Sequence, residues 1–345
     1  MKNLVTFGEI MLRLSAPDYL RFSQTQSFDS SYGGAEANLA ISLANFGMPC
    51  SFVTRLPKND IGKSALLELK QRDINIDHII WGGERLGVYF LETGAVARPS
   101  KVIYDRAYSS MSQIQPGMID WDKVFKDSDW FHWSGITPAI SQSAAEVCLE
   151  ALKVAKSKKL TISVDLNYRS KLWKYGKSAL EVMPELVDFS DIILGHGEAA
   201  EKCLGIKINH LKMFLDDGDY NINAFLDVGN QIMNKFPHAK KIATSLRKPL
   251  SSSHHILAGA IYDGEKMSVA PAQKITHIVD RIGGGDAFMA GLIYGLRAYK
   301  DNQKSIDFAV AASCLKHTIR GDVNLVTVDE VESLVNNGTE IKVSR

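Results

Sequence analysis

Three consecutive glycines stand directly before an acidic residue in the last quarter of the chain. Residues 280–291 read Asp-Arg-Ile-Gly-Gly-Gly-Asp-Ala-Phe-Met-Ala-Gly, so Gly283, Gly284 and Gly285 precede Asp286 and a helical pattern. Because glycine has no Cβ, the backbone N–H groups of such a run can turn toward one point. If they open a helix, they form an anion site that the helix dipole reinforces. The pattern predicts an anion hole with a carboxylate at its rim.

A carboxylate at the rim of an anion hole repels phosphate unless it serves as a base for an attacking hydroxyl. Phosphoryl transfer uses this arrangement, because amides neutralise the moving charge while a carboxylate takes the proton. We therefore expect Asp286 to act as a general base beside the Gly283–Gly285 turn. The alternative is that Asp286 is only the N-cap of a helix that follows a flexible loop.

A second glycine pair precedes a helical pattern near the start of the chain. Residues 33–47 read Gly-Gly-Ala-Glu-Ala-Asn-Leu-Ala-Ile-Ser-Leu-Ala-Asn-Phe-Gly. Apolar residues recur at helical spacing after Gly34, and Gly47 supplies the stop. Asn38 falls in the first turn, where its amide can point at a polar ligand. The pattern predicts a second helix whose start contributes to a binding site.

Together, the early Gly-Gly-Ala-x-x-Asn and the late Gly-Gly-Gly-Asp resemble the motifs of the ribokinase-like (PfkB) carbohydrate kinases. Further segments resemble one branch, the 2-keto-3-deoxygluconate kinases: Gly8–Leu14, Tyr104–Ala107, Asp165–Arg169, Leu315–Thr318 and Gly321-Asp322. The resemblance covers essentially the full length. It implies one kinase domain, residues 1–345, built as an α/β three-layer sandwich with a mostly parallel central sheet. It also implies that ATP and Mg²⁺ are used, and it leaves open a monovalent cation such as K⁺.

In the resembling kinases, the matching positions line the pocket of the acceptor sugar. They are Gly34, Asn38, Tyr89, Tyr104, Arg106 and Arg169. A carboxylate favours a guanidinium fork, whereas a neutral sugar needs partners such as Asp, Asn and Gln. Arg106 and Arg169 therefore predict an acidic sugar, for which the resemblance implies 2-keto-3-deoxygluconate, phosphorylated on its 6-hydroxyl. Alternatively, Arg106 is a surface residue and Arg169 pairs with a nearby acid.

On the nucleotide side, we expect Arg247 to approach the phosphates of ATP, together with Gly283 and Gly285. Arg247 ends the strand-like segment Thr244–Arg247, so the alternative is a solvent-facing charge in a turn before Pro249.

The resembling kinases commonly carry Asn-x-x-Glu, associated with magnesium, after a strand in the middle of the chain. Here residues 194–199 read Leu-Gly-His-Gly-Glu-Ala, so the motif is incomplete, and Glu198 is retained as the candidate metal ligand. The incomplete motif leaves open a sugar-binding protein with weak or no catalysis on the same fold. A kinase for a neutral sugar, fructokinase- or ribokinase-like, is the other alternative.

The elements that must position these residues alternate along the chain. Buried strands are expected at Leu4–Phe7, Ser51–Thr54, Asp129–Trp133, Leu160–Leu166, Asp191–Leu194 and Lys241–Ser245. Helical spacing with charged outer faces covers Ile61–Arg72, Ser141–Ser157, Ser178–Val187 and Asp227–Lys235. Such alternation predicts a parallel sheet covered on both faces, with ligands at the carboxyl ends of its strands.

Two segments, residues 11–32 and 85–110, break this rhythm and alternate with the period of a strand. We expect them to form a small β lid inserted in the main domain. In the resembling family such a lid closes over the sugar and contributes to dimer contacts, which implies a homo-oligomer, most simply a dimer through the lid.

The composition restricts the partners and the location of the protein. The chain has 345 residues, 45% of them hydrophobic, which is enough to bury a substantial core. A net charge of +1, without a basic run among aromatic residues, disfavours a nucleic-acid partner. No apolar stretch reaches membrane-spanning length, and the start lacks a signal region. Four scattered cysteines fit a reduced cytoplasm. Residues 205–226, which include Asp216, Asp217 and Asp219, predict a solvated surface loop.

Overall fold

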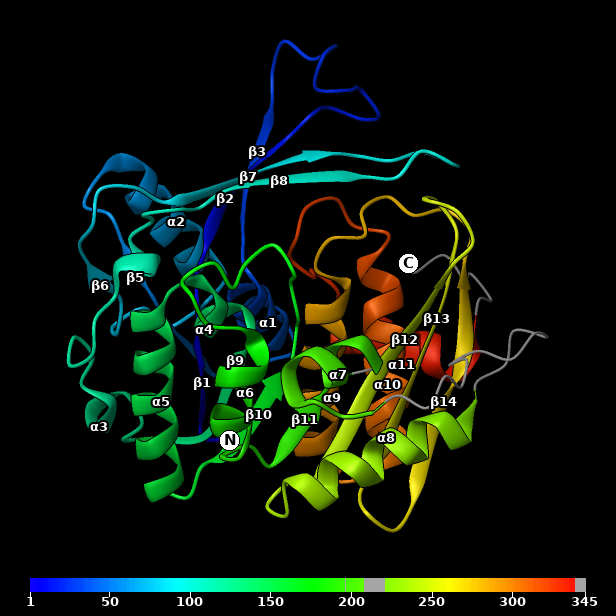
Figure 1. The fold of residues 1–345 in the computed structure, drawn as a ribbon. Coiled ribbons are helices and arrows are strands. Elements are labelled where there is room, and N and C mark those ends of the chain that lie inside the picture. Colours follow the sequence, from blue (N-terminus) through cyan, green and yellow to red (C-terminus); the bar gives the residue numbers. More distant parts are fainter. Residues whose placement is uncertain (196, 208–220, 339–345) are drawn as a thin grey trace.

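The computed structural model describes residues 1–195, 197–207 and 221–338. Within them, the largest sheet has eight strands in the order β14-β13-β12-β11-β10-β9-β1-β4 (Figure 1). The strands from β4 to β12 in this order are parallel, and β13 and β14 add an antiparallel edge. Their bounds are β1 Asn3–Phe7, β4 Cys50–Val53, β9 Ser128–Ser134, β10 Thr161–Asp165, β11 Ile192–Leu194, β12 Lys241–Pro249, β13 His255–Tyr262 and β14 Met267–Ile275.

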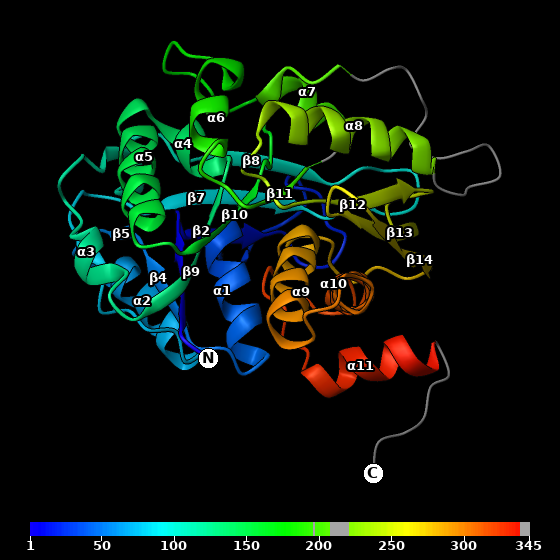
Figure 2. The ribbon, with the colours of Figure 1, turned by 90° about the horizontal axis from the view of Figure 1, so that it is seen from below.

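Helices cover both faces of this sheet, so the main body has three layers (Figure 2). One layer comprises α1 (Ala35–Asn45), α2 (Asp60–Gln71), α9 (Gly284–Ala298) and α10 (Asn302–Lys316), with α11 (Val328–Asn337) outside α10. The other comprises α5 (Gln142–Ser157), α6 (Ala179–Val187), α7 (Gly197–Leu204) and α8 (Ile222–Lys235). Short helices α3 (Trp121–Val124) and α4 (Ile136–Ile140) flank α5. The expected α/β architecture is confirmed.

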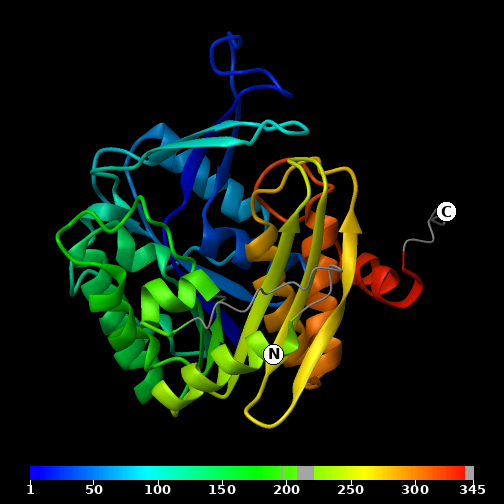
Figure 3. The ribbon, with the colours of Figure 1, turned by 45° about the vertical axis from the view of Figure 1, so that its right-hand side comes forward.

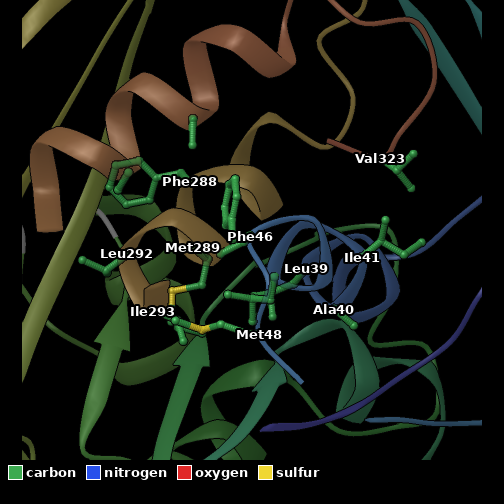
Figure 4. Close-up of a cluster of buried hydrophobic side chains, with 14 of the residues drawn as sticks. Leu39, Ala40, Ile41, Phe46, Met48, Phe288, Met289, Leu292, Ile293 and Val323 are labelled. Carbon is green, nitrogen blue, oxygen red and sulfur yellow. The ribbon is translucent and has the colours of Figure 1, made fainter. Parts of the chain in front are cut away.

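The protein has two apolar cores, one on each face of the large sheet, because successive side chains of a strand point to opposite faces. Leu4 packs into the core under α1 and α9, whereas its neighbour Val5 packs into the core under α5. Figure 4 shows the first core, in which Leu39 of α1 lies among Phe288 and Met289 of α9. Each fully buried side chain of this size contributes about 1.5–3 kcal/mol. This packing fixes α1 against α9, and these are the two helices that begin at the glycine motifs.

A second sheet of four strands, in the order β3-β2-β7-β8, lies beyond one end of the main body (Figure 3). Its strands are β2 (Met11–Ser15), β3 (Asp29–Gly33), β7 (Gly87–Glu92) and β8 (Lys101–Asp105). The chain passes from the carboxyl end of β1 straight into β2, so this sheet sits at the carboxyl ends of the parallel strands. A two-stranded sheet, β5 (Arg55–Leu56) with β6 (Ile80–Trp81), lies apart from it.

The expected strands and helices are present, with two differences in extent. Strand β12 continues to Pro249 instead of ending at Ser245, because it forms an antiparallel ladder with β13 beyond the point where its parallel neighbour β11 ends. Arg247 therefore lies within a strand and not in a turn, although its side chain is exposed, as that alternative expected. Helix α8 begins at Ile222 rather than Asp227, because Asn221 caps it by accepting a hydrogen bond from the Ala224 amide. Residues 222–226, expected in the surface loop 205–226, are therefore helical, while Asp216, Asp217 and Asp219 of that loop lie outside the described residues.

The cysteines and helices agree with the other expectations. All four cysteines are buried and free of disulfides. Among the described residues, no helix combines the length and the apolar character that a membrane crossing requires.

Candidate active site

A cavity of about 540 Å³ lies between the main body and the small sheet. Its wall includes the carboxyl ends of β10 and β11, the start of α1, the start of α9, and residues of β7 and β8. Every residue that the sequence indicated for a site lines this cavity: Gly34, Asn38, Tyr89, Tyr104, Arg106, Arg169, Glu198, Arg247, Gly283, Gly284, Gly285 and Asp286. The fold thus brings together residues from both ends and the middle of the chain.

The glycine turn shapes the start of α9. Gly283 is the N-cap in a left-handed conformation with φ 80°, and a Cβ there would lie 1.8 Å from the Asp322 carbonyl oxygen. A Cβ on Gly285 would instead meet no heavy atom within 4 Å. Within the described part of the chain, the N–H groups of Gly285 and Asp286 donate to no acceptor. Because the first amides of a helix need an outside partner, they form a site for an anion.

Asp286 is the third residue of α9, and Gly283 occupies the capping position, so the N-cap interpretation of Asp286 is wrong. Asn38 Nδ2 donates a hydrogen bond to Asp286 Oδ2 over 2.7 Å. Asn38 Oδ1 in turn accepts from the Gly34 amide over 3.2 Å, which fixes the orientation of the Asn38 amide. Burial raises the pKa of Asp286 to about 6, although the hydrogen bond from Asn38 opposes this shift. A carboxylate with this pKa is ionised at neutral pH and can accept a proton.

Arg106 follows β8 and is only 8% exposed, so it is not a surface residue. Its Nη2 donates to the buried carboxylate of Glu9, which also accepts from the Ser109 hydroxyl. The Arg106 Nε is buried without a partner among the described residues. The sequence left open that Arg169 pairs with a nearby acid. The structure shows such an ion pair at Arg106 instead, where Glu9 balances the charge.

Three other arginines reach the cavity without such a partner. Arg169, Arg247 and Arg281 make no ion pair with any residue that the structure describes. Arg281 also buries an Nε that lacks an acceptor there. The Arg247 side chain is exposed overall, but partial burial and then the charges of Arg281 and Arg169, which line the same cavity, lower its pKa. Guanidinium groups that line one cavity without a direct ion pair can bind an anionic ligand.

The two tyrosines differ in their surroundings. Tyr89 of β7 is buried and donates its hydroxyl hydrogen to Asp322. Tyr104 of β8 is exposed at the cavity wall, and its ring lies 5.9 Å from the Tyr89 ring. The carboxylate of Asp322 also accepts from Arg13 of β2 over 2.6 Å. Tyr89 thus belongs to a buried polar network that sequence reasoning did not find.

Asp165 is a second cavity residue for which the sequence analysis expected no role. It ends β10, and its Oδ1 accepts a hydrogen bond from the Asn167 amide over 3.0 Å. Burial, followed by the neighbouring charge of Asp286, raises the pKa of Asp165 to about 7. The sequence could have indicated Asp165, because this residue lies at the end of a predicted buried strand and in the same segment as Arg169.

Besides the candidate base and Asp322, which Arg13 and Tyr89 already bind, the carboxylates of Asp165 and Glu198 reach the cavity. Among the described residues, no group of three or more His, Cys, Asp or Glu side chains could enclose a metal. Mg²⁺ commonly takes one or two carboxylates together with waters and substrate phosphates. The residues therefore fit a magnesium ion that arrives with a nucleotide, and they do not form a protein cage for one.

Comparison with known proteins adds an independent line of evidence. A family model described as pfkB family carbohydrate kinase matches residues 1–327. The crystal structure of 2-dehydro-3-deoxygluconokinase from Thermotoga maritima is similar with a TM-score of 0.91 and 41% identity, covering 97% of this chain and 99% of that one. A 2-dehydro-3-deoxygalactonokinase from Haloferax volcanii is 31% identical, with 97% of both chains covered. A 2-dehydro-3-deoxygluconokinase from Thermoproteus tenax is 25% identical, with 93% of this chain and 90% of the relative covered.

Proposed function

The chain belongs to the pfkB family of carbohydrate kinases, and we propose that it transfers the terminal phosphoryl group of ATP to the 6-hydroxyl of 2-keto-3-deoxygluconate. One observation carries the choice of an acidic sugar. Arg169, Arg247 and Arg281 line the same cavity as Asp286 without an acid partner among the described residues. Guanidinium groups that form no ion pair with a described residue can bind the phosphates of the nucleotide and also a substrate carboxylate, whereas a neutral sugar offers them no anion.

The assignment of the arginines follows from their positions. Arg169 is the candidate for the sugar carboxylate, because it lines the cavity on the segment that follows β10 and forms no ion pair within the described residues, although its charge also acts on Asp165 and Asp286. Arg247 and Arg281 are the candidates for the nucleotide phosphates. Arg106 contributes mainly by shaping the pocket, because Glu9 already balances its charge. Gly34, Asn38, Tyr89 and Tyr104 complete the proposed acceptor pocket.

In the proposed reaction, the 6-hydroxyl oxygen attacks the γ-phosphorus while the bond from the γ-phosphorus to the bridging oxygen breaks, and ADP leaves. Asp286 takes the hydroxyl proton, as its pKa of about 6 allows. The free amides of Gly285 and Asp286, at the positive end of α9, stabilise the charge on the transferred group. Mg²⁺, held by Glu198 and Asp165 together with the phosphates, would offset the charge of the nucleotide.

A second acceptor has a specific observation in its favour. The Haloferax volcanii relative is named for 2-dehydro-3-deoxygalactonate, which differs from the gluconate compound only in the configuration at C4. Both acids present the same carboxylate and the same terminal hydroxyl, so the arginines and Asp286 suit either.

The small sheet supports two further proposals. Residues 11–32 and 85–110 act as the lid over the acceptor, because Tyr89 and Tyr104 face the cavity from its strands. A second copy of the chain covers its outer face, where exposed Ile103 pairs across the strands with Phe90, and the Phe28 ring meets the Phe90 ring edge to face. Light scattering should report a dimer, and Ile103→Asp should give a monomer. For location, the four buried, free cysteines are consistent with the reduced cytoplasm that the sequence predicts.

The experiment that tests the proposed function is a comparison of acceptors. ADP formation is measured with 2-keto-3-deoxygluconate, its C4 epimer, fructose and ribose, and 31P NMR locates the phosphate on the product. We expect the highest kcat/KM for one of the two acids and a phosphate at C6. Faster turnover of fructose or ribose would contradict the proposal of an acidic substrate, but it would agree with the assignment as a sugar kinase. Sugar binding without turnover of any acceptor would instead identify a binding protein.

A further inference from the structure

A fully buried lysine lies behind the glycine turn. Lys316, the last residue of α10, has 0% of its surface exposed. Its ammonium group donates to the backbone carbonyl of Asp280 over 3.3 Å and to that of Ile319 over 3.1 Å. Lysine is almost never fully buried unless it is paired. The ammonium therefore has a specific place between two loops, the one before α9 and the one after α10.

The same two loops are joined by a buried arginine. Arg13 of β2 donates to Asp280 over 2.5 Å and to Asp322 over 2.6 Å. Arg13 and Lys316 thus supply two positive charges, and Asp280 and Asp322 supply two negative charges. This cluster is neutral as a whole, so it has no excess negative charge with which to attract a further cation.

These contacts determine the shape of the glycine turn. Asp280 accepts hydrogen bonds from the Ile282 amide over 3.0 Å and from the Gly321 amide over 3.1 Å. Gly283 packs so closely on the backbone of Asp322 that no Cβ fits. The separation of the 280–283 and 319–322 loops therefore sets the direction of the amides that open α9. The Lys316 ammonium lies between a carbonyl oxygen of each loop.

We propose that the Lys316 ammonium is a built-in cation that fastens these two loops together, so that the phosphate-binding turn keeps its shape without a bound monovalent metal ion. Lys316 is then a positioning residue, since it acts on the transferred phosphoryl group only through the turn. An ammonium group is a compact point charge with three donors, so it can bind carbonyl oxygens in the manner of K⁺. The inference rests on the proposed kinase function, and it answers whether K⁺ is required.

The first test compares the turnover of the unaltered protein in salts of different monovalent cations. Turnover of the best acceptor is measured with tetramethylammonium, K⁺ or NH4⁺ as the chloride salt, and ADP is determined by chromatography so that no coupling enzyme adds a cation requirement. We expect kcat and KM for ATP to change by less than about twofold between the salts. A large activation by K⁺ would overturn the proposal. Calorimetric titration with Mg·ATP in the same buffers gives a second readout, which holds even if every acceptor tested proves wrong.

The second test replaces the lysine in two ways. Lys316→Ala leaves a space between the carbonyl oxygens, whereas Lys316→Met fills it with an uncharged chain of similar length. We expect both variants to lose at least about tenfold in kcat/KM for ATP, because the buried acids are left uncompensated. K⁺ or NH4⁺ should then restore activity to Lys316→Ala but not to Lys316→Met. Lys304→Ala, at an exposed position on the same helix, is the matched control.

The outcomes are separable. Wild-type-like kinetics of Lys316→Ala in tetramethylammonium would show that the ammonium does not hold the turn. A loss that no cation restores would reduce Lys316 to a packing residue, and either result overturns the proposal. Should the variants melt too low to be assayed, the cation comparison on the wild type still decides. Failure of the wild type on every acceptor, with Mg·ATP bound equally well in all salts, would contradict the proposed acceptors and leave this inference standing.

Discussion

Asn38 Nδ2 lies 2.7 Å from Asp286 Oδ2, although 248 positions separate the two residues along the chain. Asn38 is in the first turn of α1 and Asp286 in the first turn of α9. The apolar contacts between these helices hold the two first turns side by side. Through this hydrogen bond the two glycine motifs become one site. The bond also lowers the pKa of Asp286, against the burial that raises it.

The first prediction concerns the dependence of the rate on pH. Burial raises the pKa of Asp286 to about 6, and the base works only in its ionised form. We therefore expect kcat/KM to fall as the pH decreases through about 6, approaching about tenfold per pH unit, and to be level from there toward neutral pH. A profile without an acidic limb near this pH would contradict the assignment.

The hydrogen bond from Asn38 gives a second prediction. Asn38→Ala removes a donor that stabilises the ionised carboxylate, so the acidic limb should move to higher pH. The measurement is the midpoint of the kcat/KM profile of the variant against that of the wild type. Asn45→Ala is a suitable control, because Asn45 lies on the same helix but donates to the Asn324 carbonyl. A midpoint that moves downward or stays in place in Asn38→Ala would show that Asn38 does not set the pKa of the base.

Arg169 and Arg106 should respond differently to the same substitution. Arg169→Lys keeps the charge but loses the planar fork, so we expect a higher KM for the acid sugar, by about tenfold or more, and unchanged melting. Arg106→Lys disturbs the buried pair with Glu9, so its melting temperature should fall. Steady-state kinetics and thermal melting of both variants check this. If Arg169→Lys has no effect on KM, Arg169 does not bind the carboxylate.

The two outer glycines of the turn form a matched pair. Gly283→Ala places a Cβ against the Asp322 carbonyl at a positive φ, so we expect the variant to lose about 1–3 kcal/mol of stability or more, together with phosphate binding. Gly285→Ala meets no neighbour within 4 Å and should melt close to the wild type. Denaturant unfolding of the two variants tests the difference. Equal stability would mean that the turn is not packed as described.

Much of the fold followed from the sequence, because buried parallel strands and amphipathic helices leave strong periodic signals. The extension of β12 to Pro249 did not, since it depends on pairing with β13, which follows it along the chain. The start of α8 was missed because its cap, Asn221, precedes the first residues with clear helical spacing.

The candidate site could be predicted from the sequence only in part. The glycine motifs pointed to Asp286 and Asn38, and the structure places both at one cavity, while their roles stay predictions. The ion pair between Arg106 and Glu9 was not foreseen, because the sequence does not show which charges meet when the small sheet folds over the main body. Lys316 was hidden for a similar reason. A charged residue at the end of a helix ordinarily faces solvent, whereas this one is buried and donates to carbonyl oxygens of two loops that lie far from each other in the sequence.

The central claim is that Asp286 takes the proton of the acceptor hydroxyl, and one variant tests it most directly. Asp286→Asn keeps the shape of the side chain and can still bond to Asn38, but it lacks basicity. The measurement is kcat with the best acid sugar at pH 7.5, alongside the dissociation constant of that sugar and the melting temperature. The account predicts a fall in kcat of about two to four orders of magnitude, with sugar binding and melting close to the wild type. Turnover near the wild-type rate in the folded variant would contradict it.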